Sequence, residues 1–488
     1  MYQLSTGYRK LTKRGYIILS LALLLSIISG IAAFATNLFF VPFIPVIIVG
    51  LVIFVILLFR EPFIGLVSVF IYCFFLFVFS REINDEIQFG LGTEALLILT
   101  WLSVWYNAKR FDFSVLTNKL TILCLIWFII SVIQLVNPAG ASPTGWLQEI
   151  RSTALLPLLL APLGMILITT NKRLNTIIYI MIVCSFLGIL NGIKQKYLGL
   201  SPGEQRFLDD GGSITHVVSG QLRVFSFYSH AGQFGPSQAQ LSVACAVLAI
   251  GLKKWGRKVI LVVLSLLFFY GMLISGTRGS FFALIAAAGS AVFFARKFKI
   301  IILGVLALGF FIGILKYTNI GSSNYNIYRL RTAVDPDDPS LKVRFESQRV
   351  LADYMKSRPF GGGLGVIGTF GHKYNSDKFL STIEPDSYWV KIWVMYGIIG
   401  MIIWFSIMMY LIGKCFGIIW TVKEKSLNTK LIALGSGIIG LFVCSYGNEV
   451  MNDIPSSLIV WLSFGAIFNA HKIENSITKS ENINKEIA

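Results

Sequence analysis

Long apolar runs alternate with short polar connections along most of the chain. Many of the runs have about twenty residues, the length that an α-helix needs to cross a bilayer core about 30 Å thick. The pattern predicts about fourteen transmembrane helices, over residues 16–34, 38–59, 62–80, 92–107, 119–136, 153–170, 175–193, 236–252, 259–275, 280–295, 300–315, 388–413, 430–446 and 454–470. The predicted fold is therefore an all-α, polytopic integral membrane protein, with residues 1–470 forming a single transmembrane domain.

One long stretch, residues 316–387, interrupts this pattern and is predicted to form a large periplasmic or extracellular loop. Within it, a helix is predicted over about 341–357, capped at Ser340. Its apolar stripe would consist of Val343, Val350, Leu351 and Tyr354. The glycines at 361–365 are predicted to form a flexible turn, since no helix start is recognised after them. Residues 471–488 are polar and are predicted to form a disordered cytoplasmic tail.

Charge gives the orientation of the predicted helices. The chain of 488 residues is 55% hydrophobic and 14% charged, with a net charge of +18. Basic short connections alternate with neutral or acidic ones, as the positive-inside rule requires, which places both termini in the cytoplasm. Because topology accounts for much of the basic charge, membrane lipids are the expected surroundings and no nucleic acid partner is expected. The six cysteines lie in predicted spans or within two residues of one, and the four histidines are scattered, so neither a disulfide nor a metal or other cofactor is predicted.

Four arginines lie where predicted spans or the large loop reach the outer side: Arg151, Arg223, Arg278 and Arg344. Arg278 is the most informative, because two apolar helices flank it and ionisable groups at that depth usually face a cavity or a partner. A guanidinium binds phosphate through paired, charge-assisted hydrogen bonds. The alternative interpretation is that these arginines reach lipid headgroups. The region 316–391 carries eleven Lys and Arg and eight Asp and Glu, which fits either ordinary solvated surface or an electropositive cover over an anionic substrate.

These residues occur in segments that resemble the O-antigen polymerase and O-antigen ligase superfamily of bacterial polysaccharide assembly. The resemblance covers about 222–400 and rests on four segments in order. They are Arg223 through Gly235, Ser275-Gly276-Thr277-Arg278-Gly279, Arg344 with the stretch 358–365, and Asp386-Ser387-Tyr388 followed by 396–400.

The resemblance implies a membrane glycosyltransferase of the C type in the bacterial inner membrane. Such an enzyme uses a glycan carried on undecaprenyl pyrophosphate at the outer face, without a nucleotide sugar or an essential metal. A sugar hydroxyl would attack the anomeric carbon, and undecaprenyl pyrophosphate would leave. Arg278, Arg223 and Arg344 would stabilise the departing charge, with Arg151 as a further substrate-binding candidate. Asp386 or Glu384 would act as general base, although Asp386 also suits the N-cap of the following helix.

One departure from the family pattern separates the alternatives. Ligases typically carry His-Asn at the loop exit, where this chain has Asp386-Ser387, and this favours a polymerase of O-antigen, capsule or exopolysaccharide repeat units. His372 could replace the ligase histidine only if the loop folds back. An O-antigen ligase or protein O-oligosaccharyltransferase remains the alternative, and a chain-length regulator is a candidate partner. A lipid-linked oligosaccharide flippase is less favoured, because the chain has no recognisable internal repeat.

Overall fold

The structure is a computed structural model that describes residues 43–83, 89–218, 220–296, 339–385 and 387–487, with separate residues between 15 and 30 and between 309 and 335. It confirms the all-α membrane class. Every predicted span other than 16–34 and 300–315, which lie largely outside the described residues, coincides with a helix. In the described part, eight helices are long and apolar enough to cross a membrane. The total number of spans stays a prediction.

The chain divides into two compact units. The smaller unit, residues 1–65 and 98–110, contains α2 (Ile44–Arg60) and the second half of α4 (Gly90–Tyr106). Within it, Ser103 Oγ donates a hydrogen bond to the Leu58 carbonyl over 2.7 Å. Asn107 Nδ2 donates to the Phe59 carbonyl, also over 2.7 Å. These bonds satisfy carbonyls at the end of α2, which have no partner inside the helix.

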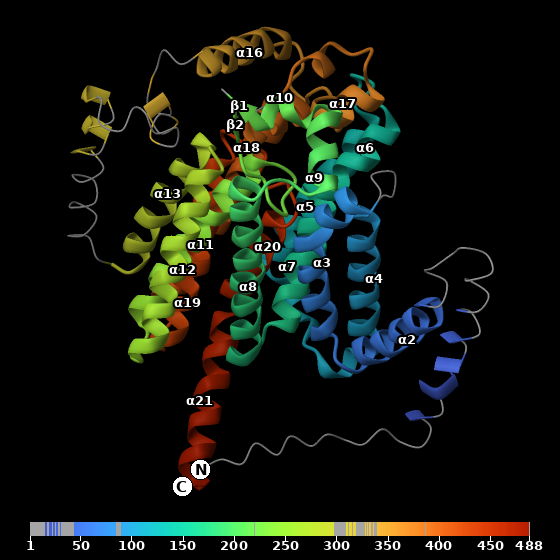
Figure 1. The fold of residues 1–488 in the computed structure, drawn as a ribbon, viewed down its shortest axis with the longest axis vertical. Helices are drawn as coiled ribbons and strands as arrows, with labels where there is room; N and C mark the ends of the chain where they lie inside the picture. Colours follow the sequence, from blue (N-terminus) through green and yellow to red (C-terminus); the bar gives the residue numbers. More distant parts are fainter. Residues whose placement is uncertain are drawn as a thin grey trace. The chain divides into compact units, whose positions relative to one another are not determined.

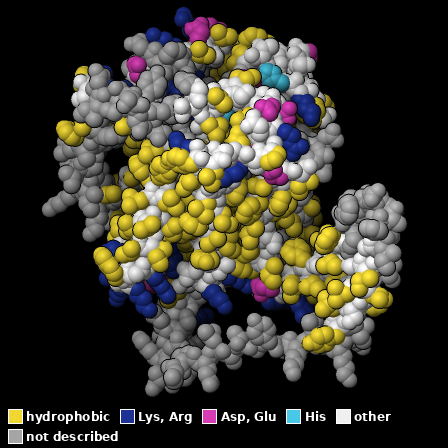
Figure 2. All heavy atoms as spheres, in the orientation of Figure 1, with side chains coloured by type: hydrophobic (Ala, Val, Ile, Leu, Met, Phe, Trp, Pro, Cys, Tyr) yellow, Lys and Arg dark blue, Asp and Glu magenta, His cyan; other side chains and the backbone are white. Residues whose placement is uncertain are grey.

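The larger unit, residues 66–97 and 111–488, holds the remaining helices. Its long helices run alongside one another in Figure 1, and their bounds are α3 (Phe63–Glu82), α5 (Lys119–Ile133), α7 (Leu156–Leu167), α8 (Asn171–Tyr197), α11 (Ala231–Gly251), α12 (Trp255–Ile274), α13 (Arg278–Phe294), α18 (Tyr388–Thr421), α19 (Lys425–Cys444) and α20 (Ser456–Phe468). The helix α11 packs against α12, α13 and α19, and α20 packs against α7 and α19. Figure 2 shows hydrophobic side chains over the flank of these helices and charged ones gathered toward the ends, as a bilayer requires.

Short elements gather at one end of this unit (Figure 1). They are α6 (Pro143–Ile150), α9 (Pro202–Phe207), α10 (Ser213–His216), α16 (Pro339–Met355) and α17 (Gly368–Tyr374), together with the antiparallel strands β1 (Val217–Val218) and β2 (Gln221–Leu222). The helix α6 continues into α7 through a π-helical turn at Arg151–Leu155. The helix α16 confirms the predicted loop helix but begins one residue before Ser340. Its predicted stripe is partly wrong: Leu351 and Met355 are buried, whereas Val343 and Val350 are exposed.

The glycine-rich turn is buried rather than flexible, and a helix, α17, does follow it. The reason lies in α18, which is broken at Gly397, where φ is 70°. The break leaves two carbonyls without helical partners, and the turn supplies them: Gly362 N–H donates to Val394 O over 2.8 Å, and Gly363 N–H donates to Met395 O over 3.1 Å. The kink in α18 thus anchors the large loop to the membrane helices.

The predicted disorder of residues 471–488 is wrong, because α21 (Ala470–Ile487) is a helix. Ile473 is fully buried, and α21 packs against α8, α19 and α20. The Glu474 carboxylate accepts hydrogen bonds from the backbone N–H groups of Lys423 and Glu424. A few apolar residues at helical spacing therefore order a segment whose overall composition is polar.

Substitution of Gly397 by alanine tests the anchoring kink. A Cβ there would lie 2.0 Å from the Pro359 carbonyl oxygen, and the positive φ disfavours any residue with a side chain. We expect Gly397→Ala to destabilise the protein by about 2 kcal/mol or more, measured by thermal unfolding in detergent. Gly413→Ala on the same helix is the control, since nothing lies within 4 Å of its Cβ position. Equal melting temperatures for the two variants would contradict this account.

Candidate active site

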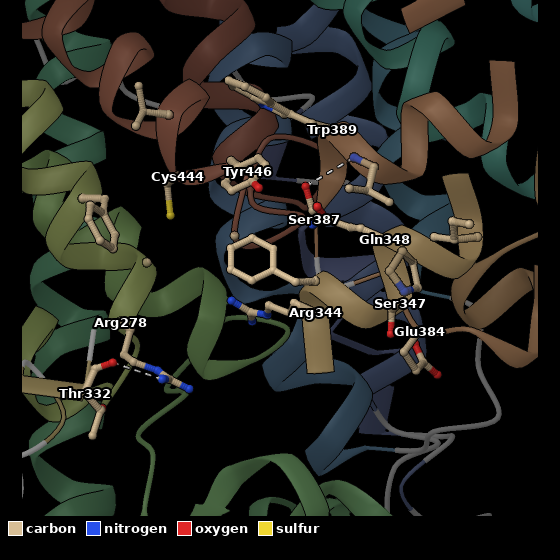
Figure 3. Close-up of a pocket in the computed structure, with 18 residues that line it drawn as sticks. Arg278, Thr332, Arg344, Ser347, Gln348, Glu384, Ser387, Trp389, Cys444 and Tyr446 are labelled. Atoms are coloured by element: carbon tan, nitrogen blue, oxygen red, sulfur yellow. Dashed lines mark hydrogen bonds between the residues drawn. The ribbon is translucent and has the colours of Figure 1, made fainter. Parts of the chain in front are cut away.

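A cavity of about 590 Å³ lies at the end of the larger unit where α16 and α17 gather. Its walls come from the start of α13, from α16, from the loop exit with the start of α18, and from the end of α19 (Figure 3). Residues nearly 170 positions apart in the chain, from Arg278 to Gly447, therefore line one space. Most of the exposed surface inside is apolar, with a few charged groups, as is usual for ligand-binding pockets.

Two of the predicted arginines line this cavity. Arg278 is the first residue of α13, and its Nη1 donates a hydrogen bond to the Thr332 carbonyl over 3.5 Å. Arg344 extends from α16, and Figure 3 shows the two guanidinium groups pointing toward one another. Gly447 lies under Arg344: a Cβ there would come within 4.0 Å of Arg344 Nη1. Both cations therefore line the same cavity.

Glu384 lines the same cavity, together with Pro385 and Ser387. His372 Nε2 lies 2.7 Å from Glu384 Oε1, within hydrogen-bonding distance. The loop does fold back, because α17 carries His372 onto the loop exit. Asp386 lies outside the described residues. The N-cap of α18 is Ser387, whose Oγ accepts the Val390 N–H, so the capping role suggested for Asp386 belongs to its neighbour.

The other two predicted arginines lie outside the cavity wall. Arg223 Nη2 donates to Thr277 Oγ1 over 3.1 Å, which places it beside the residue that precedes Arg278. Arg151 faces a separate cavity of about 180 Å³, where its Nη2 lies 2.8 Å from Glu94 Oε2. The structure therefore brings Arg278, Arg344, Glu384 and His372 together, with Arg223 adjacent and Arg151 apart.

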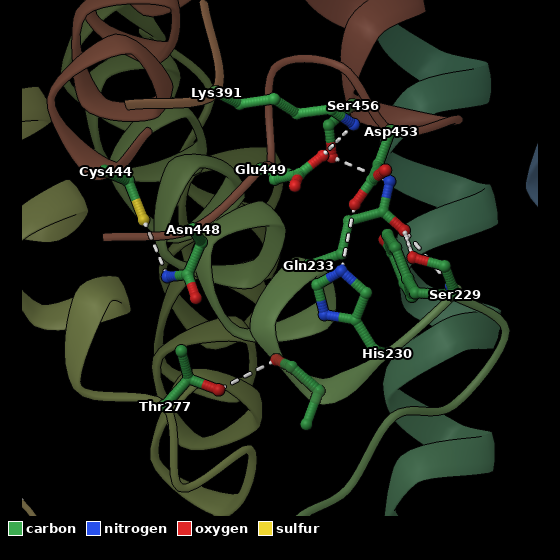
Figure 4. A network of polar contacts seen from close by, with 12 residues as sticks. Ser229, His230, Gln233, Thr277, Lys391, Cys444, Asn448, Glu449, Asp453 and Ser456 are labelled. Atoms are coloured by element: carbon green, nitrogen blue, oxygen red, sulfur yellow. Dashed lines mark hydrogen bonds and ion pairs between the residues drawn. The ribbon is translucent and has the colours of Figure 1, made fainter. Parts of the chain in front are cut away.

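A buried ionic cluster beside the cavity was not predicted. Lys391 Nζ lies 2.8 Å from Glu449 Oε2 and 3.1 Å from Glu149 Oε1. In the adjoining network (Figure 4), Asp453 Oδ2 lies 2.9 Å from His230 Nε2. A lysine inside an apolar helix was the available signal, because such a charge needs a partner. Its partners could not be identified from the sequence.

Burial raises the pKa of Glu449 to about 7, opposed by the charge of Lys391 and reinforced by Glu149 and Asp453. Lys391 Nζ lies between the carboxylates of Glu149 and Glu449. Among the residues that the structure describes, no group of three or more His, Cys, Asp or Glu side chains is arranged to hold a metal ion.

Comparison with known proteins supports the resemblance. Residues 263–405 match the family model described as O-antigen ligase. The matched segment contains Arg278, Arg344, His372 and Glu384 and includes the start of α18. No curated protein matches the chain. The match supports the O-antigen ligase and polymerase superfamily, whose members are glycosyltransferase-like enzymes of polytopic membrane type.

The raised pKa of Glu449 predicts a pH dependence of stability. Folded Glu449 keeps its proton up to about pH 7, whereas an ordinary glutamate loses it near pH 4.5. Raising the pH through this interval therefore favours unfolding, by up to about 3 kcal/mol. We expect Glu449→Gln to remove this contribution, so that the difference in melting temperature between variant and wild type grows between about pH 5 and pH 8. A difference that stays constant with pH would contradict the assignment.

Proposed function

We propose that this chain is a polymerase of lipid-linked oligosaccharide repeat units, with O-antigen, capsule or exopolysaccharide as its product. It would transfer glycan from undecaprenyl pyrophosphate to a sugar hydroxyl at the outer face of the bacterial inner membrane, with both of its termini in the cytoplasm. The observation that carries the proposal is the placement of Arg278, Arg344 and Glu384 around one cavity. The family match over 263–405 supplies the chemical class.

The arginine end of the cavity suits the pyrophosphate of the donor. Both guanidinium groups present planar forks to phosphate oxygens and stay charged at any physiological pH. Arg278 is also the first residue of α13, where the helix dipole favours an anion. Apolar side chains such as Phe282, Phe345 and Trp389 line the same space and suit the first isoprene units.

The carboxylate end suits proton transfer. The acceptor hydroxyl oxygen forms a bond to the anomeric carbon of the donor sugar, and the bond from that carbon to the pyrophosphate oxygen breaks. The bonding electrons leave with undecaprenyl pyrophosphate, whose added charge falls to Arg278 and Arg344. The hydroxyl proton passes to Glu384, which His372 orients. Asp386 is the second candidate base, since both of its neighbours line the cavity.

A ligase is the second candidate function. The contact between His372 and Glu384 supports it, because it gives the loop exit a histidine that the local sequence lacks. The Asp386-Ser387 exit favours the polymerase. Deletion of the gene separates the two: loss of a polymerase leaves single repeat units on their acceptor, and loss of a ligase leaves long chains on undecaprenyl carrier. Accumulation of carrier-linked units inside the cell would contradict both and indicate a flippase.

Substitution of the two cavity arginines tests their role. We expect Arg278→Ala and Arg344→Ala each to lower polymer formation by about 10²-fold or more, because each removes charge stabilisation of the leaving group. The measurement is complementation of the deletion strain, with surface glycan separated on a gel and membrane insertion checked by immunoblot. Arg349→Ala is the matched control, because Arg349 is exposed on the same helix α16 and does not line the cavity. Normal polymer length and yield from Arg278→Ala would overturn the proposed role.

A further inference from the structure

Two walls of the cavity are joined by contacts that lie behind its surface. The first wall is Glu384 to Val390, the loop exit with the start of α18, and the second is Val443 to Gly447, the end of α19. Between them, Tyr388 N–H donates to the Ser445 carbonyl over 2.9 Å. The ion pair of Lys391 with Glu449 makes a second connection one helical turn deeper.

A third segment completes this connection. Glu149 on α6 lies 3.1 Å from Lys391 Nζ, and its Oε1 also accepts a hydrogen bond from Thr153 Oγ1 over 2.9 Å. The side chain of Lys391 is 7% exposed and that of Glu149 is fully buried. One ammonium therefore holds α6, α18 and the α19–α20 connection at a common point, although these segments are about 240 and 60 residues apart in sequence.

The charges of the cluster make the lysine indispensable to it. Two carboxylates, Glu149 and Glu449, face a single ammonium, and in the described part of the chain Glu149 Oε2 has no hydrogen-bond partner. Asp453 is adjacent and is paired with His230 from the start of α11. Without Lys391 the two carboxylates would repel one another in a poorly solvated site, and the segments that carry them would move apart.

We propose that Lys391 is a positioning residue of the transfer reaction, which sets the distance between the loop exit with Glu384 and the wall formed by Tyr446 and Gly447 beneath Arg344. The inference rests on the proposed function. Lys391 does not line the cavity and so does not touch the substrate. Its effect is on geometry, because a base and a leaving-group site that are about 1 Å out of place cost about 10²-fold in rate.

The test is steady-state kinetics of the purified full-length protein in liposomes. The donor is the lipid-linked repeat unit extracted from the deletion strain. We expect Lys391→Met to lower kcat by about 10²-fold while the KM for donor stays within about threefold, because Arg278 and Arg344 are intact. Glu149→Gln removes one arm of the cluster and keeps the size and shape of the side chain, so it should fold and lower kcat by about tenfold at an unchanged melting temperature. Lys391→Arg should recover part of the kcat lost in Lys391→Met.

Glu204→Gln is the matched control, because Glu204 is also a buried glutamate paired with a lysine, Lys194, away from the cavity. It should keep the wild-type kcat. If Lys391→Met does not fold, Glu149→Gln decides. Two results would overturn the inference about Lys391 and leave the proposed function standing. One is a wild-type kcat in Glu149→Gln, and the other is a loss of kcat that follows the loss of melting temperature in all variants. A wild-type protein that transfers no glycan overturns the proposed function and this inference with it.

Discussion

A charge that is buried without a partner in a low-dielectric interior costs several kcal/mol, and this cost explains how the larger unit is arranged. Arg81, Glu149 and Lys391 are buried charged residues whose partners come from distant segments. Arg81 of α3 donates hydrogen bonds to the carbonyls of Ser226, Tyr228 and Ser229, at 2.7 to 3.0 Å, and so fixes the segment that leads from Arg223 to α11. Lys391 does the same for α6, α18 and the α19–α20 connection. The need to pair charges thus draws remote parts of the chain to the end that carries the cavity.

Hydrogen bonding of the backbone determines how the large loop attaches to the membrane helices. The break at Gly397 releases carbonyls of α18, which must find donors, and the glycine-rich turn after α16 provides them. This contact seats the large loop on the membrane helices. It brings Arg344 over the end of α19 and lets α17 carry His372 back to Glu384. The arrangement of the candidate site therefore depends on the kink of α18 at Gly397 and on the buried Lys391. Neither of these two residues lines the cavity.

The sequence predicted those parts of the structure that follow from local pattern. The start of α18 at Tyr388, the loop helix near 339–355 and the position of Arg278 between two apolar helices all follow from hydrophobic periodicity and from single polar residues in apolar surroundings. That Arg278 is itself the first residue of α13 was not predicted. Ion pairs between residues that are far apart in the sequence could not be predicted. Nothing local indicates that Arg151 pairs with Glu94 or that Lys391 meets Glu149, because such contacts depend on how helices pack. The order of residues 471–487 was missed for a related reason, since it depends on burial of Ile473 against other helices.

The central claim is that Arg278 and Arg344 jointly bind the pyrophosphate of a polyprenyl carrier, with Glu384 across the cavity to receive a proton. The most direct test is an electron cryomicroscopy structure of the protein in lipid nanodiscs with undecaprenyl pyrophosphate added. The account predicts pyrophosphate density within hydrogen-bonding distance of both guanidinium groups, with the isoprene chain passing along Phe282 and Trp389. Pyrophosphate bound at Arg151 in the separate cavity, or density that contacts neither Arg278 nor Arg344, would contradict it.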